Sequence, residues 1–559
     1  MRGPTRETAG KDVSAGLTLG VVSVPDGLAA GLLAGVNPIF GLYGYLVGTF
    51  TGAVATSSVF MSVQATGAMA VIISDVPAVQ NGPDADAALF TLSVLTGLVM
   101  LTLGLLRLGS LVRFVPNAVL TGFINAVAVT IVLGQLANLT GYTSTAGNRV
   151  TRAVDTLLNI PSFDLPTFVI GLSTIALILL LERTFLGSLG MVVAVVVTSA
   201  AVTVLGLESV KTVSDLASIP DSLPRPGLPS LSLVAGLLVP ALSLALVGLV
   251  QGAAISNSIP NPDGRYPDAS GDFRGQGLAN IASGLFQGMP VGGSMSATAL
   301  VTAAGARTRL ANLVAGVTMA VLIVAVGGLV GAIAMPALAG LLVLIGIRTF
   351  NADNVVMVWR TGPTQAAIMV TTFVLTLLIP LQFAVLVGVG LSVILYVANQ
   401  SSKVRVIRWE FDEPGGLPIE ADVPRELPPS EIVVLQPYGS LFFAAAPVFE
   451  SQLPLVTQQS TGSVVIVRLR GEQELGSTFL KVIDRYAGEL VAVGSRLMLA
   501  GVGERVERQL IATGLMDALG PDAVFRATPL LTGSLQGALE EAERWRAEDA
   551  GSAGEAAPG

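Results

Sequence analysis

The sequence contains no cysteine and no histidine, and only 12% of its residues are charged. Without cysteine there can be no disulfide and no thiol catalysis, and zinc sites built from cysteine and histidine are excluded. Imidazole proton relays are excluded as well, so any proton coupling has to use a carboxylate. No glycine-rich phosphate loop occurs in a strand–loop–helix context. We therefore expect a protein that is not an enzyme and that holds neither a metal nor a cofactor.

Charged residues are concentrated at the N-terminus, in short loops and after about residue 400. The net charge of −8 therefore belongs largely to the C-terminal part, and no basic patch predicts a nucleic-acid partner. Apolar residues make up 52% of the chain and the mean hydropathy is +0.74, which is typical of membrane spans in contact with lipid. The start, MRGPTRETAGKDVSAG, lacks a signal-peptide pattern, so we expect the first apolar run to lead directly into the membrane part.

A membrane-spanning helix needs roughly 20 apolar residues. Short runs included, the sequence offers fourteen candidates: 13–33, 38–57, 61–74, 88–106, 116–138, 164–183, 188–206, 232–256, 278–289, 294–304, 308–332, 335–349, 366–380 and 383–398. With the N-terminus inside, the outer loops receive only Arg149, Arg152, Lys211 and Arg225, and the other loop arginines and lysines fall inside. Because positive residues stay on the cytoplasmic side, we expect both termini there.

Two short helices stand at matching positions in the order of spans. MSVQATGAMAVII (Met61–Ile73) is third in the first seven, and GGSMSATALVTAA (Gly292–Ala304) is third in the second seven. Short, glycine-interrupted segments at corresponding positions of two halves mark the central site of many transporters. We therefore expect two structural repeats, one at about residues 12–206 and one at about residues 232–400. A chance match, or tight packing of small residues, is the alternative.

The chain changes character after Lys403. A polar, proline-rich stretch at 401–429 predicts a linker. Short apolar segments then alternate with amphipathic helical ones at 430–545, which predicts a small α/β domain. The remaining domain boundaries follow: an N-terminal segment at 1–11, a transmembrane domain at 12–400 and a disordered tail at 546–559.

Both short helices would begin in mid-membrane, where their unpaired N–H groups and positive dipole ends form an anion site without a basic side chain. Hydroxyl and amide groups can add hydrogen bonds at Ser62, Gln64, Thr66, Ser294, Ser296 and Thr298. Simple N-capping is the alternative role for these serines and threonines, and it is compatible with anion binding.

Asp26 lies near the middle of the first span, directly after Pro25. A carboxylate at that depth costs at least about 2.5 kcal/mol on insertion scales, so it should face the protein interior and is a functional candidate. A protonated aspartate that only hydrogen-bonds a neighbouring helix is the alternative. Gln251, within the eighth span, is a candidate neutral hydrogen-bonding partner in the core.

Three stretches, DVSAGLTLGVVSVPDGLAAGLLAGVNPIFGLY, GQGLANIASGLFQGMPVGGSMSATALVTAAGARTRLANLVAG and MPALAGLLVLIGIRTF, resemble the sulfate permease (SulP) family of anion transporters. The C-terminal segment resembles that family's STAS domain. The resemblance covers about residues 10–545. It implies a polytopic α-helical fold of fourteen spans in two inverted seven-helix repeats, which form core and gate domains, followed by a cytoplasmic α/β STAS domain.

The resemblance also implies a function: secondary active transport of a small inorganic anion (sulfate, bicarbonate or chloride) by an elevator-type movement, in a homodimer in the bacterial cytoplasmic membrane. Substrate would lie between the third and tenth helices. The residues expected to bind it are Asp26, Ser62, Gln64, Thr66, Gln251, Gly293, Ser294, Met295, Ser296, Ala297 and Thr298.

The sequence departs from the family pattern at three of these positions. Asp26 replaces the usual glutamine, Gln251 replaces an acid that serves the cation in sodium-coupled relatives, and Ala297 stands near an arginine of some members. We therefore expect protons rather than sodium as the coupling ion, with Asp26 as the carrier, because a protonated aspartate donates to an anion that its ionised form would repel.

Other functions are open at this point. A nucleobase- or dicarboxylate-type carrier could use the same fold, although nucleobase sites usually have acids where Gln251 and Ala297 stand. An anion channel, or a scaffold whose STAS domain signals, is a further alternative. In that domain Ser477 is the candidate regulatory residue by resemblance to phosphorylated relatives, but Gly476 replaces their aspartate, and a structural or dimer-supporting role is the alternative.

Overall fold

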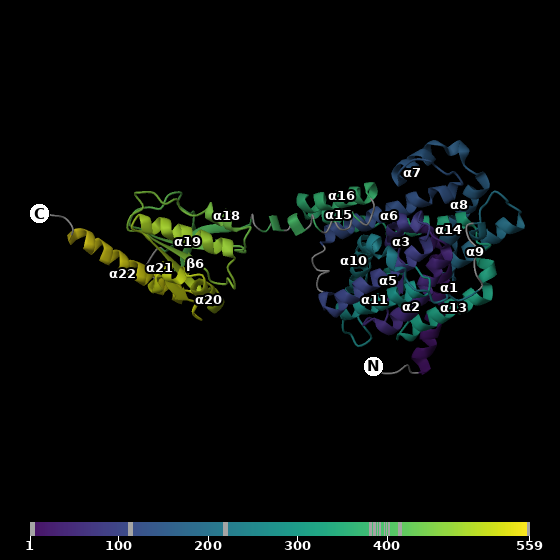
Figure 1. The fold of residues 1–559 in the computed structure, drawn as a ribbon, viewed down its shortest axis with the longest axis horizontal. Coiled ribbons are helices and arrows are strands. Elements are labelled where there is room, and N and C mark those ends of the chain that lie inside the picture. Colours follow the sequence, from purple (N-terminus) through teal and green to yellow (C-terminus); the bar gives the residue numbers. More distant parts are fainter. Residues whose placement is uncertain are drawn as a thin grey trace. The chain divides into compact units, whose positions relative to one another are not determined.

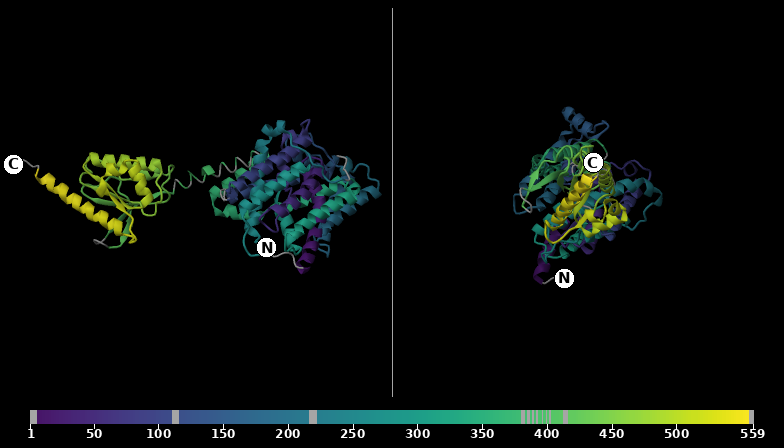
Figure 2. Two further views of the ribbon diagram at one scale, coloured as in Figure 1. Left: turned by 60° about the horizontal axis from the view of Figure 1, so that its bottom comes forward. Right: turned by 90° about the vertical axis from the view of Figure 1, so that its left-hand side faces the viewer.

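The computed structural model describes residues 6–109, 116–215, 222–379, 403–411 and 416–555, with isolated residues between 383 and 400. The chain divides into two compact units, Met1–Ser392 and Val393–Gly559. The first consists of helices apart from one pair of short strands, and the second combines a sheet with helices (Figure 1 and Figure 2).

The first unit contains the helices expected from the apolar runs. Its helices are α1 (Arg6–Leu33), α2 (Pro38–Ala55), α3 (Gly67–Ser74), α4 (Pro77–Gln80), α5 (Ala85–Leu105), α6 (Asn117–Thr140), α7 (Arg149–Leu158), α8 (Leu165–Leu181), α9 (Leu189–Val204), α10 (Val234–Ser258), α11 (Ala269–Leu285), α12 (Met295–Ala303), α13 (Leu310–Val330), α14 (Met335–Thr349), α15 (Ala352–Thr361) and α16 (Pro363–Leu378). Six helical stretches of the described chain are long and apolar enough to cross a membrane, and four more are apolar but shorter.

Several expected boundaries are wrong, for physical reasons. Helix α11 begins at Ala269 rather than near 278, because its first turns contain buried polar residues such as Asp272 and Gln276 that interrupt the apolar run. The third expected span is helical only from Gly67, since Ser62–Gln64 forms strand β1. Helices α7 and α15 were not expected, because both are amphipathic rather than uniformly apolar. The expected span at 383–398 lies largely outside the described residues.

The helices of the first unit pack as two sets. The α1 set comprises α1–α5 and α10–α13, in which α1 packs on α2 and α13, and α11 packs on α5 and α2. The α6 set comprises α6–α9 and α14–α16, in which α14 and α16 both pack on α6. Contacts between the sets are fewer and join α3 to α6 and α1 to α9 and α14. The first unit therefore consists of two groups of helices that are packed mainly within themselves.

The second unit is built on a six-stranded sheet in the order β4-β3-β5-β6-β7-β8. The strands are β3 (Arg405–Phe411), β4 (Pro418–Ala421), β5 (Ile432–Tyr438), β6 (Val464–Arg468), β7 (Arg496–Val502) and β8 (Val524–Arg526). Strands β5 to β8 are parallel and almost continuously apolar, as expected of strands covered on both faces. Helix α19 (Ser477–Ala492) packs on β7 and contacts α18 (Ala446–Glu450) and α21 (Leu515–Leu519). Helix α22 (Gly533–Glu555) runs across β5 to β8, and α20 (Glu504–Ala512) packs on α21.

The structure of the second unit corrects two expectations for the C-terminal part. The segment 401–429 is not a linker throughout, because β3 and β4 pair with each other and β3 pairs with β5. Val406 and Ile407 in β3 supply the buried side chains that the polar neighbours obscured in the sequence. Helix α22 continues to Glu555, into the segment 546–559 expected to be disordered, because its alanine and glutamate residues favour helix.

Candidate functional site: two helix N-termini joined by a strand pair

Two short extended segments lie side by side in the first unit, and each leads into one of the two short helices. Strand β1 pairs antiparallel with β2 (Gly292–Ser294), with Ser62 opposite Ser294 and Gln64 opposite Gly292. Helix α12 begins directly after Ser294, and α3 begins three residues after Gln64. Because the strands run in opposite directions, the two helices leave the pair at opposite ends, and both N-termini face the pairing region.

The two N-termini are capped in the same way. Thr66 is the N-cap of α3, and its hydroxyl accepts a hydrogen bond from the N–H of Met69 at 3.4 Å. Ser294 is the N-cap of α12, and its hydroxyl accepts from the N–H of Ala297 at 3.3 Å. These side-chain oxygens satisfy the third N–H group of each helix.

The first two N–H groups of each short helix have no hydrogen-bond partner among the described residues. They belong to Gly67 and Ala68 in α3 and to Met295 and Ser296 in α12. Each helix N-terminus also carries about half a positive charge. Gly67 is half-buried and Ala68 is buried, whereas Met295 and Ser296 are exposed, so the donors of α12 are the more accessible pair. The arrangement can bind an anion through backbone groups.

Helix α11 holds the backbone of β2 in place through a row of buried side chains at i, i+4 and i+7. Gln276 accepts a hydrogen bond from the N–H of Gly293 at 2.9 Å. Asn280 accepts from the N–H of Val291 at 2.8 Å and donates to its carbonyl at 2.6 Å, and Ser283 donates to the carbonyl of Met289 at 2.7 Å. Extended backbone within a membrane protein requires such internal partners.

Side chains of α1, α2, α12 and α13 hold β1. The hydroxyl of Ser62 donates to Asn312 at 2.7 Å, and its N–H donates to the hydroxyl of Thr298 at 3.1 Å. The amide of Gln64 donates to Ser23 at 3.0 Å and to Thr49 at 3.2 Å. Ser62, Gln64 and Thr298 therefore use hydrogen bonds to shape the backbone, which makes them supports of the site in this structure rather than free donors.

Asp26 lies beside this region on α1. It stands three residues after Ser23, so both side chains lie on the same side of the helix, and Ser23 contacts Gln64 of β1. Asp26 is half-buried, and its carboxylate makes no hydrogen bond to any described residue. The carboxylate is thus available to a proton or a ligand.

The other expected site residues divide into two groups. Gln251 of α10 accepts a hydrogen bond from the Thr66 hydroxyl at 2.9 Å, which connects it directly to the N-cap of α3. Ser296 lies within 3.2 Å of the Ser294 hydroxyl, so the two share a hydrogen bond. Ala297 instead packs its side chain in an apolar cluster with residues of α1 and α13, and only its backbone belongs to the capped turn.

The supporting residues Ser23, Gln276, Asn280 and Asn312 were missed in the sequence. All are polar residues inside helices of the membrane part and are almost completely buried. Intramembrane polar residues are costly and usually have an interior partner, and this signal could have identified them. Their spacing alone could not have shown that they support β1 and β2.

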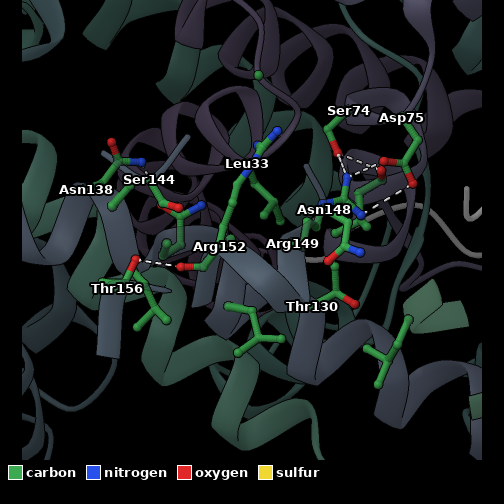
Figure 3. A pocket seen from close by; sticks show the side chains of 18 of the residues that line it. Leu33, Ser74, Asp75, Thr130, Asn138, Ser144, Asn148, Arg149, Arg152 and Thr156 are labelled. Carbon is green, nitrogen blue, oxygen red and sulfur yellow. Dashed lines mark hydrogen bonds and ion pairs between the residues drawn. The ribbon is translucent and has the colours of Figure 1, made fainter. Parts of the chain in front are cut away.

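A cavity of about 540 Å³ lies at the other end of α3, not at the two N-termini. Its lining includes Leu33 of α1, Asp75 after α3, and Thr130, Arg149 and Arg152 of the α6 set (Figure 3). In the second unit, Ser477 is exposed at the first position of α19, with Gly476 as N-cap.

The comparison with known families decides the identity of both parts. The model of the sulfate permease family matches residues 10–372, which include every element of the site described above. The chain belongs to the sulfate permease family. A STAS domain matches residues 427–528, which confirms the second domain expected from the sequence. The helical membrane part of the expected fold is confirmed as well, while the count of fourteen spans and the inverted repeats stay predictions.

Relatives in this family are transporters rather than enzymes. The chain is 28% identical over 526 residues to "Probable sulfate transporter MT1781" of Mycobacterium tuberculosis, covering 93% of this chain and 94% of that protein. It is 27% identical over 413 residues to "Bicarbonate transporter BicA" of Picosynechococcus sp., covering 71% of this chain and 72% of that protein. The fold resembles that of the murine Slc26a9 anion transporter in its inward-facing state, with a TM-score of 0.83, 17% identity and coverage of 97% and 92%.

Proposed function

We propose that this protein is a secondary active transporter of a small inorganic anion, with sulfate as the first candidate and bicarbonate or chloride next. The observation that carries the proposal is the pair of capped helix N-termini, whose first two N–H groups have no partner among the described residues. Four backbone donors and two helix dipoles can replace the hydration of an anion without a basic side chain.

In this proposal Thr66, Ser294 and Ser296 lie around the anion, and the N–H groups of Gly67, Ala68, Met295 and Ser296 donate to it. Gly293 and Ala297 shape the site beside them, with their own N–H groups bonded to Gln276 and Ser294. Gln251 orients Thr66 through their hydrogen bond. Ser62, Gln64 and Thr298 keep β1 in position. Small inorganic anions suit a site of this kind, because N–H groups and hydroxyls are donors that bind oxyanions and halides alike.

Transport would proceed by movement of the α1 set, which contains α3 and α12, against the α6 set. The packing of the helices supports this division, since contacts within each set exceed those between them. The α1 set would then be the core and the α6 set the gate of an elevator with fourteen spans in two inverted repeats. We place the protein as a homodimer in a bacterial cytoplasmic membrane, with its termini and STAS domain in the cytoplasm and Ser477 as a candidate regulatory residue.

Asp26 would carry the coupling proton. It is near β1, is half-buried, and is without a hydrogen-bond partner among the described residues. An ionised Asp26 would repel a substrate anion, and a protonated one would not, so proton and anion would bind together. Neither Gln251 nor Ala297 offers a charge that a sodium ion or a nucleobase would need.

The experiment that tests the function is uptake by the purified protein in proteoliposomes. Labelled sulfate, bicarbonate and fumarate are each supplied with no gradient, with an inward proton gradient and with a sodium gradient. We expect saturable uptake of an inorganic anion that the proton gradient drives above equilibrium. Fumarate uptake alone would indicate a dicarboxylate carrier, non-saturating flux would indicate a channel, and no flux of any of the three would contradict the proposal.

A further inference from the structure

An ion pair joins the two helix sets at the C-terminal end of α3. Asp75 is the C-cap of α3, and Arg149 is the first residue of α7. The Arg149 guanidinium donates to Asp75 through both terminal nitrogens, at 2.5 Å and 3.3 Å, and to the Ser74 hydroxyl at 2.6 Å. Two further ion pairs of the described part of this unit, Arg274–Asp268 and Arg348–Glu182, each lie within one set.

Neither charge is placed where it would stabilise its own helix. Asp75 is a negative charge at the C-terminal end of α3, and Arg149 is a positive charge at the N-terminal end of α7, so each opposes its helix dipole. The two charges compensate each other while the sets are together. The pair is therefore better explained as a contact between the sets than as a helix-capping device.

The surroundings make this contact reversible. The Arg149 side chain is 26% exposed and the Asp75 side chain is 18% exposed. Both residues line the 540 Å³ cavity between the sets (Figure 3). Because the cavity gives water access to both side chains, each charge can be solvated when the pair opens, which lowers the cost of opening compared with a fully buried pair. Helix α3 has eight residues and is about 12 Å long, so Asp75 lies one short rigid helix away from the proposed anion site.

We propose that the Asp75–Arg149 pair is a latch that closes this end of the boundary between the two helix sets. The latch opens when α3 moves along the α6 set and closes again when it returns. The inference rests on the proposed function for its place in a transport cycle, because that function supplies the movement of one set against the other. The latch itself is a property of the structure and can be measured without transport.

The test uses a reporter at the wall of the cavity. Thr130 of α6 is buried and lines the cavity, and the chain contains no cysteine, so Thr130→Cys is the single thiol. Its rate of reaction with a small, membrane-impermeant methanethiosulfonate reagent is measured in proteoliposomes without substrate or gradient. We expect Asp75→Asn and Arg149→Gln each to raise this rate several-fold. The exchanged pair Asp75→Arg with Arg149→Asp should return it towards the original value.

Asp155→Asn is the matched control. Asp155 is also an aspartate at this end of the unit, but it accepts hydrogen bonds from Tyr142 and Asn159 within the α6 set. Its substitution should leave the rate unchanged. Unchanged rates in both Asp75→Asn and Arg149→Gln, or an equal increase in Asp155→Asn, would overturn the latch. The two single variants change opposite sides of the pair. If one of them misfolds, the labelling rate of the other still tests the latch.

Sulfate uptake by the same proteoliposomes separates the two proposals. Faster labelling in the latch variants with no uptake by the parent protein would contradict the proposed function and support the latch. Uptake by the parent with unchanged labelling in the variants would support the function and overturn the latch.

Discussion

At the scale of single residues, Asp26 distinguishes coupled from uncoupled transport. Its carboxylate is near β1 and makes no hydrogen bond to a described residue, so it is free to gain and lose a proton. We expect Asp26→Asn to reduce proton-driven uptake by about tenfold or more, which corresponds to losing roughly 1.4 kcal/mol of coupling. Anion binding should persist, because asparagine is neutral like the protonated acid. Uptake with and without a pH gradient, and anion affinity by calorimetry, measure the two effects.

The matched control is Asp86→Asn in the first turn of α5, which should keep proton-driven uptake. Accumulation by Asp26→Asn that still follows the pH gradient would show that Asp26 is not the proton carrier. The alternative role, a protonated aspartate that only supports packing, predicts equal losses of binding and uptake.

Residue types near the site could be predicted from the sequence, but their individual roles could not. Thr66 and Ser294 are expected from their position before short apolar helices, and both are N-caps. Ser62 and Thr298 have the same hydroxyl chemistry, yet the Thr298 hydroxyl binds the backbone of Ser62 and Ser294, and the Ser62 hydroxyl donates to Asn312. The pairing of β1 with β2 joins residues that are more than 200 positions apart in the sequence. This pairing determines which side of each extended segment faces a ligand, so no local sequence pattern can predict that side.

At the scale of elements, the close packing of α10 against Gln276 of α11 helps to hold β2 in place. A Cβ atom at Gly252 would lie 2.1 Å from the amide nitrogen of Gln276 and 3.0 Å from its oxygen. Gln276 would have to move and would release the N–H of Gly293, and leaving such a buried group unpaired costs about 1–3 kcal/mol. We therefore expect Gly252→Ala to weaken sulfate binding about tenfold or more, at roughly 1.4 kcal/mol per decade, as calorimetry would measure.

The same helix supplies the control. A Cβ atom at Gly236 meets nothing within 4 Å, so Gly236→Ala should leave binding unchanged. Alanine in a helix is favoured over glycine by about 0.5–1 kcal/mol, and the control should be at least as thermostable as the parent protein. Equal binding by both variants would mean that the position of β2 does not determine affinity.

Element prediction from the sequence succeeded where apolar runs are uninterrupted and failed where function requires polar residues. Helices α6 and α8 have nearly the expected bounds. The first two turns of α11 were missed, because Asp272 and Gln276 are buried polar residues that bond backbone or hydroxyl groups of other elements. These exceptions lie at the site, where a hydrophobic pattern has to be broken to hold extended backbone inside the bundle.

At the scale of the whole molecule, the separation into a helical and an α/β unit could be predicted, because the two follow different periodicities and charge contents. The extent of the second unit could not. Strand β3 reads as a polar linker, since Arg405, Arg408 and Glu410 surround its two buried residues Val406 and Ile407, and only pairing with β5 shows that it completes the sheet. A strand on the β3–β4 side of the sheet needs one covered face, so its sequence carries a weaker signal than β6 or β7.

The orientation of the chain in the membrane follows from its loop charges and can be tested with single cysteines. The loop after α6 contains Thr145, on the side expected to face outward, and the arginine-containing loop after α10 contains the exposed Tyr266. Positive loops stay in the cytoplasm, so Thr145→Cys should react with a membrane-impermeant maleimide on intact cells, whereas Tyr266→Cys should react only after permeabilisation. The parent chain has no cysteine and gives the background directly. The reverse labelling pattern would place the Asp75–Arg149 latch on the cytoplasmic side and invert the direction assigned to the proton gradient.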